Sequence, residues 1–217
     1  RNHVNILVFV LLSLYSIKPT TSHAQDVHFS QFFEAPLLRN PALAGLFKGD
    51  IRIQGIYRNQ WASVTTPFVT SAISVEYKRP IGSSDDFITY SAQVLYDKAG
   101  AAALTTTNIM PALNYHKSLN EEKNKYLSLG IMGGLVQRRF DRSKITTNNN
   151  YDGNGYNPSL GDGESFTNSN FTYLDGSIGL SYNSTIAEKA EDNYFIGVAY
   201  HHFNKPKNSF YNNPDVE

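Results

Sequence analysis

Few residues of this sequence stand at the spacings that metal binding or catalysis requires. The run NYDGNG, residues 150–155, matches the first half of an EF-hand calcium loop. Its first position is Asn150 where Asp is usual. Its twelfth position, where a bidentate Glu is needed, is Gly161, and Asp162 and Glu164 miss the register. We interpret the run around Asp152 as polar turn residues and predict no metal ligands.

The histidines and the basic residues suggest no reaction centre either. His201 and His202 are adjacent, so in a strand their side chains point to opposite faces and do not share a metal. A basic cluster follows a predicted strand and comprises Arg138, Arg139, Arg142 and Lys144. Such a cluster can bind a ligand but is more typical of a solvated rim. The sequence contains no nucleophile elbow, phosphate-binding loop or HExxH motif. We therefore predict neither an enzyme nor a cofactor.

The composition limits the class of protein. The chain has 217 residues, of which 41% are hydrophobic and 18% charged, and its formal net charge is +0. This balance argues against a nucleic-acid partner, which requires a basic surplus. The absence of cysteine excludes disulfides and thiolate chemistry. The 14 Tyr and 13 Phe, set among many small polar residues, are typical of a β-sheet protein.

The first 24 residues resemble a secretory signal peptide. An apolar run extends from Ile6 to Leu12 behind Arg1, and Ser22 and Ala24 occupy the −3 and −1 positions of a cleavage site before Gln25. The run is about half the roughly 20 residues of a spanning helix, so a membrane anchor is the weaker alternative. We expect residues 1–24 to be a signal peptide and the mature chain to be exported.

The mature chain alternates apolar and polar residues in segments much longer than ordinary strands. The predicted strands cover residues 50–58, 69–78, 87–96, 104–117, 126–137, 172–183 and 194–201. Their length of about 9–14 residues suits a tilted bilayer-spanning strand, which needs about 9–11, and exceeds the usual 5–6 of soluble strands. Tyrosines at the ends of the apolar rows are typical of the aromatic girdles of outer-membrane barrels. The predicted fold class is therefore an all-β, antiparallel transmembrane β-barrel.

The predicted barrel has two different faces. In residues 87–96, Tyr90 and Val94 lie on the apolar row and Ser91 on the polar row. In a membrane barrel the apolar row, including Val94 and Ile131, faces lipid and the polar row faces the lumen. A soluble sandwich or a lipocalin-like barrel would turn the apolar row inward. Alternation alone does not distinguish these folds, because all of them have period two.

The connections agree with a barrel whose N-terminus lies in the periplasm. Residues 25–49 form a periplasmic or lumenal segment, and residues 50–217 an incomplete barrel of about seven strands. The long Asn- and Gly-rich connection, residues 140–171, then falls on the outer side, where bacterial barrels place their long loops. Seven strands do not close such a barrel. Because the chain also starts at Arg1 and ends at Glu217 without a terminal strand, we expect a fragment that lacks its C-terminal strands.

Three motifs carry a family resemblance. HFSQF at residues 28–32 is followed by NPALAG at residues 40–45 and by YRNQW at residues 57–61. Shorter matches follow at residues 95–97, 136–138 and 201–203. In this order and spacing the chain resembles the PorP/SprF family of Bacteroidetes, over residues 26–210. The departure is mild and lies at Ala62-Ser63, where the family pattern is more proline-like.

The resemblance implies a non-enzymatic β-barrel of the cell outer membrane that serves type IX protein secretion and gliding motility. The implied partners are the periplasmic ring components of the secretion system or a large secreted adhesin, in addition to outer-membrane lipid. Residues that carry the likeness without any catalytic group are the candidate partner contacts: His28, Phe29, Gln31, Asn40, Pro41, Tyr57, Arg58, Asn59, Gln60 and Trp61.

Other functions remain open from the residues alone. A general porin or small-solute transport barrel would place constriction charges in the lumen, and Glu76 and Lys78 are candidates for them. A barrel enzyme such as a lipase would need a Ser/His/Asp set or paired acids at the rim, and no such set is legible. Trp61 is either a partner contact or a residue that anchors the barrel at the membrane interface.

Overall fold

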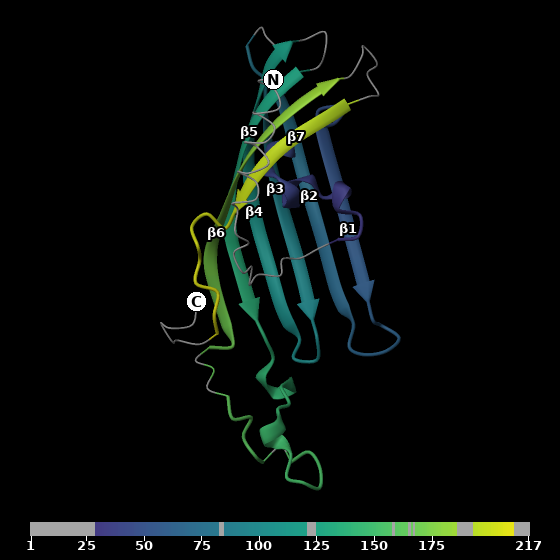
Figure 1. Ribbon diagram of the computed structural model, residues 1–217, viewed down its shortest axis with the longest axis vertical. Coiled ribbons are helices and arrows are strands. Elements are labelled where there is room, and N and C mark those ends of the chain that lie inside the picture. Colours follow the sequence, from purple (N-terminus) through teal and green to yellow (C-terminus); the bar gives the residue numbers. More distant parts are fainter. Residues whose placement is uncertain are drawn as a thin grey trace, which may run out of the picture.

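A computed structural model describes residues 29–82, 85–120, 125–157, 159–164, 166, 168–185 and 193–210. Within these residues seven antiparallel strands form one sheet in chain order. They are β1 (Ile51–Gln60), β2 (Phe68–Pro80), β3 (Phe87–Ala99), β4 (Leu104–Asn120), β5 (Lys125–Arg139), β6 (Asn170–Thr185) and β7 (Asn193–His201). The sheet curls into part of a barrel wall (Figure 1), which confirms the predicted fold class. The predicted signal peptide lies outside the described residues.

Short helices occur in two connecting segments. The segment before β1 contains η1 (Phe32–Glu34), α2 (Pro36–Arg39) and η2 (Pro41–Leu43). The connection between β5 and β6 contains η3 (Arg142–Lys144) and η4 (Asn148–Asn150). None of the helices in the described part of the chain is long and apolar enough to cross a membrane.

Every predicted strand is present, and most extend further at their ends. The extension arises because polar residues beyond the apolar rows continue the ladder, as in the pair of Lys98 with Thr105. β4 and β5 are 17 and 15 residues long. Adjacent strands are joined as hairpins, so every ladder is between neighbours in sequence.

The two faces of the sheet carry the inverse of a soluble protein's pattern. On the concave face polar side chains are buried, with Glu76, Asn114, His116 and Ser128 all inaccessible to solvent. On the convex face large apolar side chains are exposed, and Ile131 in the middle of β5 is 50% exposed. Leaving so much apolar surface uncovered is unfavourable in water and favourable against lipid. The convex rows include Ile73, Val75, Val94, Ile109, Leu113, Leu129, Ile131, Leu135, Leu180 and Val198.

The connections alternate between the two ends of the sheet. The β1–β2, β3–β4 and long β5–β6 connections lie at one end of the sheet, and the β2–β3 turn lies at the other, together with the last residues of β4 and β6 (Figure 1). This arrangement follows from an all-antiparallel meander, in which successive hairpins reverse direction. The longest connection therefore shares its end with the turn that carries Trp61.

A carboxylate clamp holds the β2–β3 turn against β4. Asp86 accepts hydrogen bonds from Tyr115 Oη, Lys117 Nζ and the Ser118 backbone N–H, each at 2.8 Å. These donors, with Lys117 first, lower the pKa of the Asp86 carboxyl from 3.8 to about 2. The ionised carboxylate is thus favoured by the fold over the unfolded chain.

We expect Asp86→Asn to weaken the fold and to flatten its acid sensitivity. A carboxyl whose pKa is lowered on folding stabilises the fold above its unfolded pKa, and this contribution disappears as the pH falls through the folded value. The window here is pH 4 to 2, since the pKa falls from 3.8 to about 2. Urea midpoints of the detergent-folded protein across this range measure the effect. The exposed neighbour Asp85, changed to Asn, is the control and should keep the wild-type profile.

Candidate functional site

The segment before β1 lies against the concave face of the sheet. Its helix η2 contacts β4, β5, β6 and β7, and Figure 1 shows the small helices (purple) beside the inner side of the strands. Pro41 and Leu43 of η2 are buried, as are Ala42 and Ala44. The NPALAG motif is therefore the part of the segment that is seated most deeply on the sheet.

Asn40 fixes the start of this motif by three hydrogen bonds. Its Nδ2 donates to the carbonyls of Leu180 and Val198, both at 3.2 Å, and its Oδ1 accepts from the Ala42 backbone N–H at 2.8 Å. Its amide thus caps η2 and also satisfies carbonyls of β6 and β7. Gly179 provides the space, because a Cβ at this position would collide with the Asn40 side chain.

Polar side chains of β4 and β5 bind the other end of the motif. Asn114 Nδ2 donates to the carbonyls of Pro41 and Ala44, at 3.1 and 3.0 Å. His116 Nε2 lies 2.6 Å from Ala44 O, so this nitrogen carries the proton, and Nδ1 accepts from Ser128 Oγ at 2.6 Å. Buried backbone carbonyls that no strand pairs are thereby satisfied by side chains.

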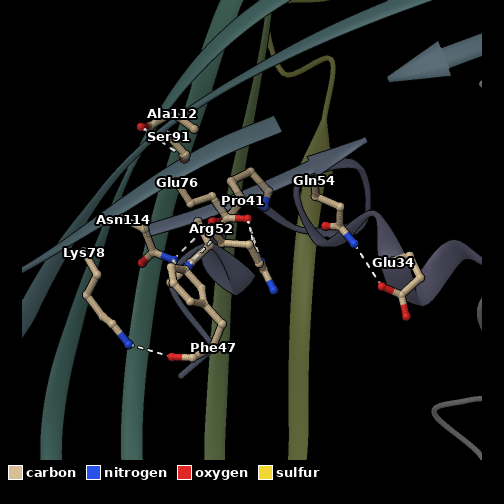
Figure 2. A network of polar contacts seen from close by, with 12 residues as sticks. Glu34, Pro41, Phe47, Arg52, Gln54, Glu76, Lys78, Ser91, Ala112 and Asn114 are labelled. Carbon is tan, nitrogen blue, oxygen red and sulfur yellow. Dashed lines mark hydrogen bonds and ion pairs between the residues drawn. The ribbon is translucent and has the colours of Figure 1, made fainter. Parts of the chain in front are cut away.

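An ion pair whose carboxylate is fully buried holds the last residue of the motif. Glu76 Oε2 accepts from the Gly45 backbone N–H at 2.8 Å, and Glu76 Oε1 accepts from Arg52 Nε and Nη2 at 2.9 and 2.6 Å (Figure 2). Lys78 Nζ donates to Phe47 O at 2.7 Å. Gly45 has φ +85, and its Cβ position is occupied by Thr89, so only glycine fits there. Glu76 and Lys78 thus both bind the segment before β1.

His201 reaches the same segment, and the expectation that His201 and His202 point to opposite faces is wrong, because His202 lies beyond the end of the strand. His201 Nε2 donates to Arg39 O at 3.2 Å, and Nδ1 accepts from Ser177 Oγ at 3.0 Å. β7 ends at His201, and His202 turns back with φ 54, so it bonds Asp175 Oδ2 at 2.8 Å. Both imidazoles therefore reach the same row of β6. Strand alternation does not apply beyond the last paired residue.

The HFSQF and YRNQW motifs meet at β1. Phe29 is buried in an apolar cluster with Ala35, Ala72 and Leu95, and the Arg58 guanidinium lies 5.7 Å from its ring centroid. Arg58 Nη2 also donates to Thr70 Oγ1 at 3.0 Å. Arg58 is thus engaged on the concave side. His28 lies outside the described residues, and Gln31 is exposed next to η1.

The remaining YRNQW residues face solvent or lipid. Tyr57 is 68% exposed and Trp61 62% exposed, and Asn59 and Gln60 are also exposed. Trp61 has φ 65, which is rare for a bulky residue, and its carbonyl accepts from the N–H groups of Val64 and Thr65 at 3.1 and 3.0 Å. The candidate contact residues therefore form two sets: a buried one around Asn40 and Pro41, and an exposed one at the end of β1.

The polar loop between β5 and β6 has internal partners. Asp152 Oδ1 accepts from the N–H groups of Asn154 and Gly155, at 2.9 and 3.0 Å, as in an Asx turn. Arg142 pairs with Asp162 at 3.1 Å, and Lys144 with Asp141 at 3.4 Å. No cluster of three or more metal-ligating residues occurs among the residues that the structure describes.

The sequence does not identify the residues that hydrogen-bond the NPALAG motif. The alternation places Asn114, His116, Ser128 and Arg52 among the polar residues of the strands but does not single them out. The sequence does contain one signal. Asn114 and His116 lie two residues apart on the polar row, and they are larger than the Ser, Thr and Gly residues that usually line a water-filled lumen. Pairing these residues with NPALAG needs the tertiary structure.

Long antiparallel strands with apolar side chains outside and polar side chains buried inside define an outer-membrane β-barrel type of protein. A family model described as "Type IX secretion system membrane protein PorP/SprF" matches residues 21–216. The chain therefore belongs to the PorP/SprF family and is an outer-membrane component of type IX secretion. No curated protein and no solved structure matched the sequence.

Proposed function

We propose that this outer-membrane protein acts without catalysis of its own, by binding a protein partner at the exposed end of β1. The connections place this end on the outer side of the membrane, so the partner proposed for it is a large secreted adhesin. A periplasmic ring component of the secretion machinery, the alternative partner, would bind at the opposite end of the barrel. Family membership supports the setting in secretion. The observation that carries the binding role is the exposed Trp61, held at φ 65 in the β1–β2 turn.

Exposure and backbone geometry together favour recognition at Trp61. A bulky residue at positive φ is unfavourable, and such geometry is retained mainly where it serves a function. Tryptophan and tyrosine are the residue types that most often dominate interface energies. Tyr57 lies in β1, four residues before Trp61, and is also exposed. Arg58 lies between them but points inward, so we assign it to positioning β1 through Thr70 and Phe29.

The polar interior supports partner binding over the general porin. A porin lumen presents free charges to passing solutes. Here Glu76 binds Arg52 and Gly45, and Lys78 binds Phe47 O, so both candidate constriction charges are engaged with the segment before β1. We propose that residues 25–49 serve as a lumenal segment. Liposome swelling tests this choice: rapid solute uptake would favour the porin.

We expect Trp61→Ala to abolish most secretion or surface display of the partner while the barrel still assembles. Truncating an interface anchor costs about 2 kcal/mol or more, which weakens binding by about thirtyfold. Surface display and pull-down of the partner measure the loss, and heat-modifiability on gels reports folding. The matched control is Tyr151→Ala, an equally exposed aromatic in the β5–β6 connection.

Two outcomes would contradict the recognition role. Full display by the Trp61 variant would remove this residue from the interface. A variant that no longer shows heat-modifiability would instead make Trp61 a structural anchor at the membrane interface.

A further inference from the structure

A cavity of about 540 Å³ lies on the concave side, between the segment before β1 and the sheet. It is bounded by Lys78 near the end of β2 and by residues at the starts of β3, β5 and β7, namely Phe87, Tyr126 and Phe195. It therefore lies toward the end of the sheet that carries the β2–β3 turn, opposite the end that carries Trp61.

The lining of this cavity is basic. Four cationic residues line it, Arg39, Lys48, Arg52 and Lys78, and no acidic residue is among its described lining. Glu76 Oε1 forms an ion pair with Arg52 Nη2 at 2.6 Å, and the negative charge of the exposed Asp50 acts on Lys78. Arg39 and Lys48 have no acidic partner among the ion pairs of the described residues. The cavity thus retains a positive excess.

Arg39 is the most informative of these residues. Its guanidinium lies near three rings, those of Phe32, Phe33 and Phe195, at 5.7, 5.1 and 5.8 Å from their centroids. Its Nε is buried without a hydrogen-bond partner. Burial lowers the pKa of this guanidinium from its ordinary value. A partly buried guanidinium with an unpaired Nε has unmet hydrogen-bonding capacity, and a carboxylate forms strong charge-assisted hydrogen bonds with a guanidinium.

The remaining walls suit an apolar side chain beside the anion. The ring centroid of Phe47 lies 4.7 Å from Arg52 Cζ and 4.9 Å from Lys78 Nζ. Phe33, Leu46 and Phe87 also line the cavity. A lipid headgroup is the less suitable ligand, because the sheet separates this cavity from the convex face that meets lipid. A peptide that carries an acidic residue next to an apolar one matches both parts of the lining.

We propose that this cavity binds an acidic peptide segment of a partner protein, with its carboxylate on Arg39 and its apolar side chain among the phenylalanine rings. Lys48 adds a second, exposed cation to the lining of the cavity. The site is separate from the Trp61 surface and does not depend on it.

Fluorescence anisotropy with the detergent-folded full chain tests the proposal. The probes are labelled acetylated hexapeptides that contain one glutamate next to one phenylalanine, and the same peptides with glutamine in place of glutamate. We expect the glutamate peptides to bind and the glutamine peptides to bind about tenfold more weakly. Arg39→Gln should weaken glutamate-peptide binding about tenfold, in line with one lost charged hydrogen-bonding group.

Lys48→Gln keeps the test decisive even if the Arg39 variant fails to fold, because Lys48 is exposed. We expect this variant to bind about threefold more weakly. Lys144→Gln, in the β5–β6 connection, is the matched control and should bind like wild type. The proposal is overturned if every cavity variant that folds binds the glutamate peptides normally, or if glutamine peptides bind equally well. It is also overturned if inorganic phosphate or anionic-lipid vesicles bind through Arg39 and the peptides do not.

Discussion

Ile131→Arg is expected to destabilise the folded protein by about 2–4 kcal/mol, the cost of an arginine on the lipid face near the bilayer midplane. Ile131 lies in the middle of β5 on the convex face and is half exposed, and its cross-strand partners Leu113 and Ile178 are apolar, so neither can pair a charge. Outer-membrane fractionation, heat-modifiability and urea unfolding of the variant in lipid vesicles measure the loss.

The control for Ile131 lies on the same face of the same strand. Gln137 is exposed near the end of β5, so Gln137→Arg should cost only about 0–1 kcal/mol, because the penalty falls toward the interface. Equal damage at both positions would contradict the lipid-facing assignment. Normal assembly of the Ile131 variant would contradict the membrane setting of β5.

Gly130→Ala is expected to detach the NPALAG motif from the sheet. A Cβ built on Gly130 would lie 2.5 Å from the backbone N of Ala42 and closer still to the carbonyl carbon of Pro41. Backbone atoms cannot rotate away as a flexible side chain can, so the segment must shift. Overpacking of this kind costs about 1–3 kcal/mol. Limited proteolysis of the folded protein should cleave the segment before β1 faster than in wild type.

Gly55→Ala is the matched control for this substitution. Gly55 also lies within a strand, but nothing is within 4 Å of its Cβ position. An added methyl group there should be neutral or stabilise the strand by about 0.5–1 kcal/mol. If Gly130→Ala leaves both protease resistance and stability unchanged, the motif is not seated on β5 in the folded protein.

The occupied interior changes one expectation about the polar row. The pattern predicts that an arginine at Ser91 or Ser128 is tolerated better than one at Val94 or Ile131, because lumenal positions normally face water. In the structure Ser128 is fully buried and donates to His116, whose ring bonds Ala44 O. We therefore expect Ser128→Arg to be as harmful as a lipid-facing arginine.

Sequence by itself determined the strands and their two faces. Alternation has a period of two that depends only on local backbone geometry, so Val94 and Ser91 could be placed on opposite faces without knowing any neighbour. The hairpin order and the position of the long connection followed as well, since short connections between antiparallel strands leave few topologies. Family membership could also be inferred, because the HFSQF, NPALAG and YRNQW motifs recur in a set order and spacing.

Only the tertiary structure decided what those motifs do. Asn40 bonds carbonyls 140 and 158 residues away in the chain, and Asn114 bonds Pro41 across 73 residues. Contacts at such separations leave no local pattern in one sequence. The same applies to Arg58, which shares a motif with Tyr57 and Trp61 but points inward to Thr70 and Phe29. Neighbouring residues of one motif therefore differ in burial. The pleat of the strand points them to opposite faces, and the segment before β1 covers only the concave face.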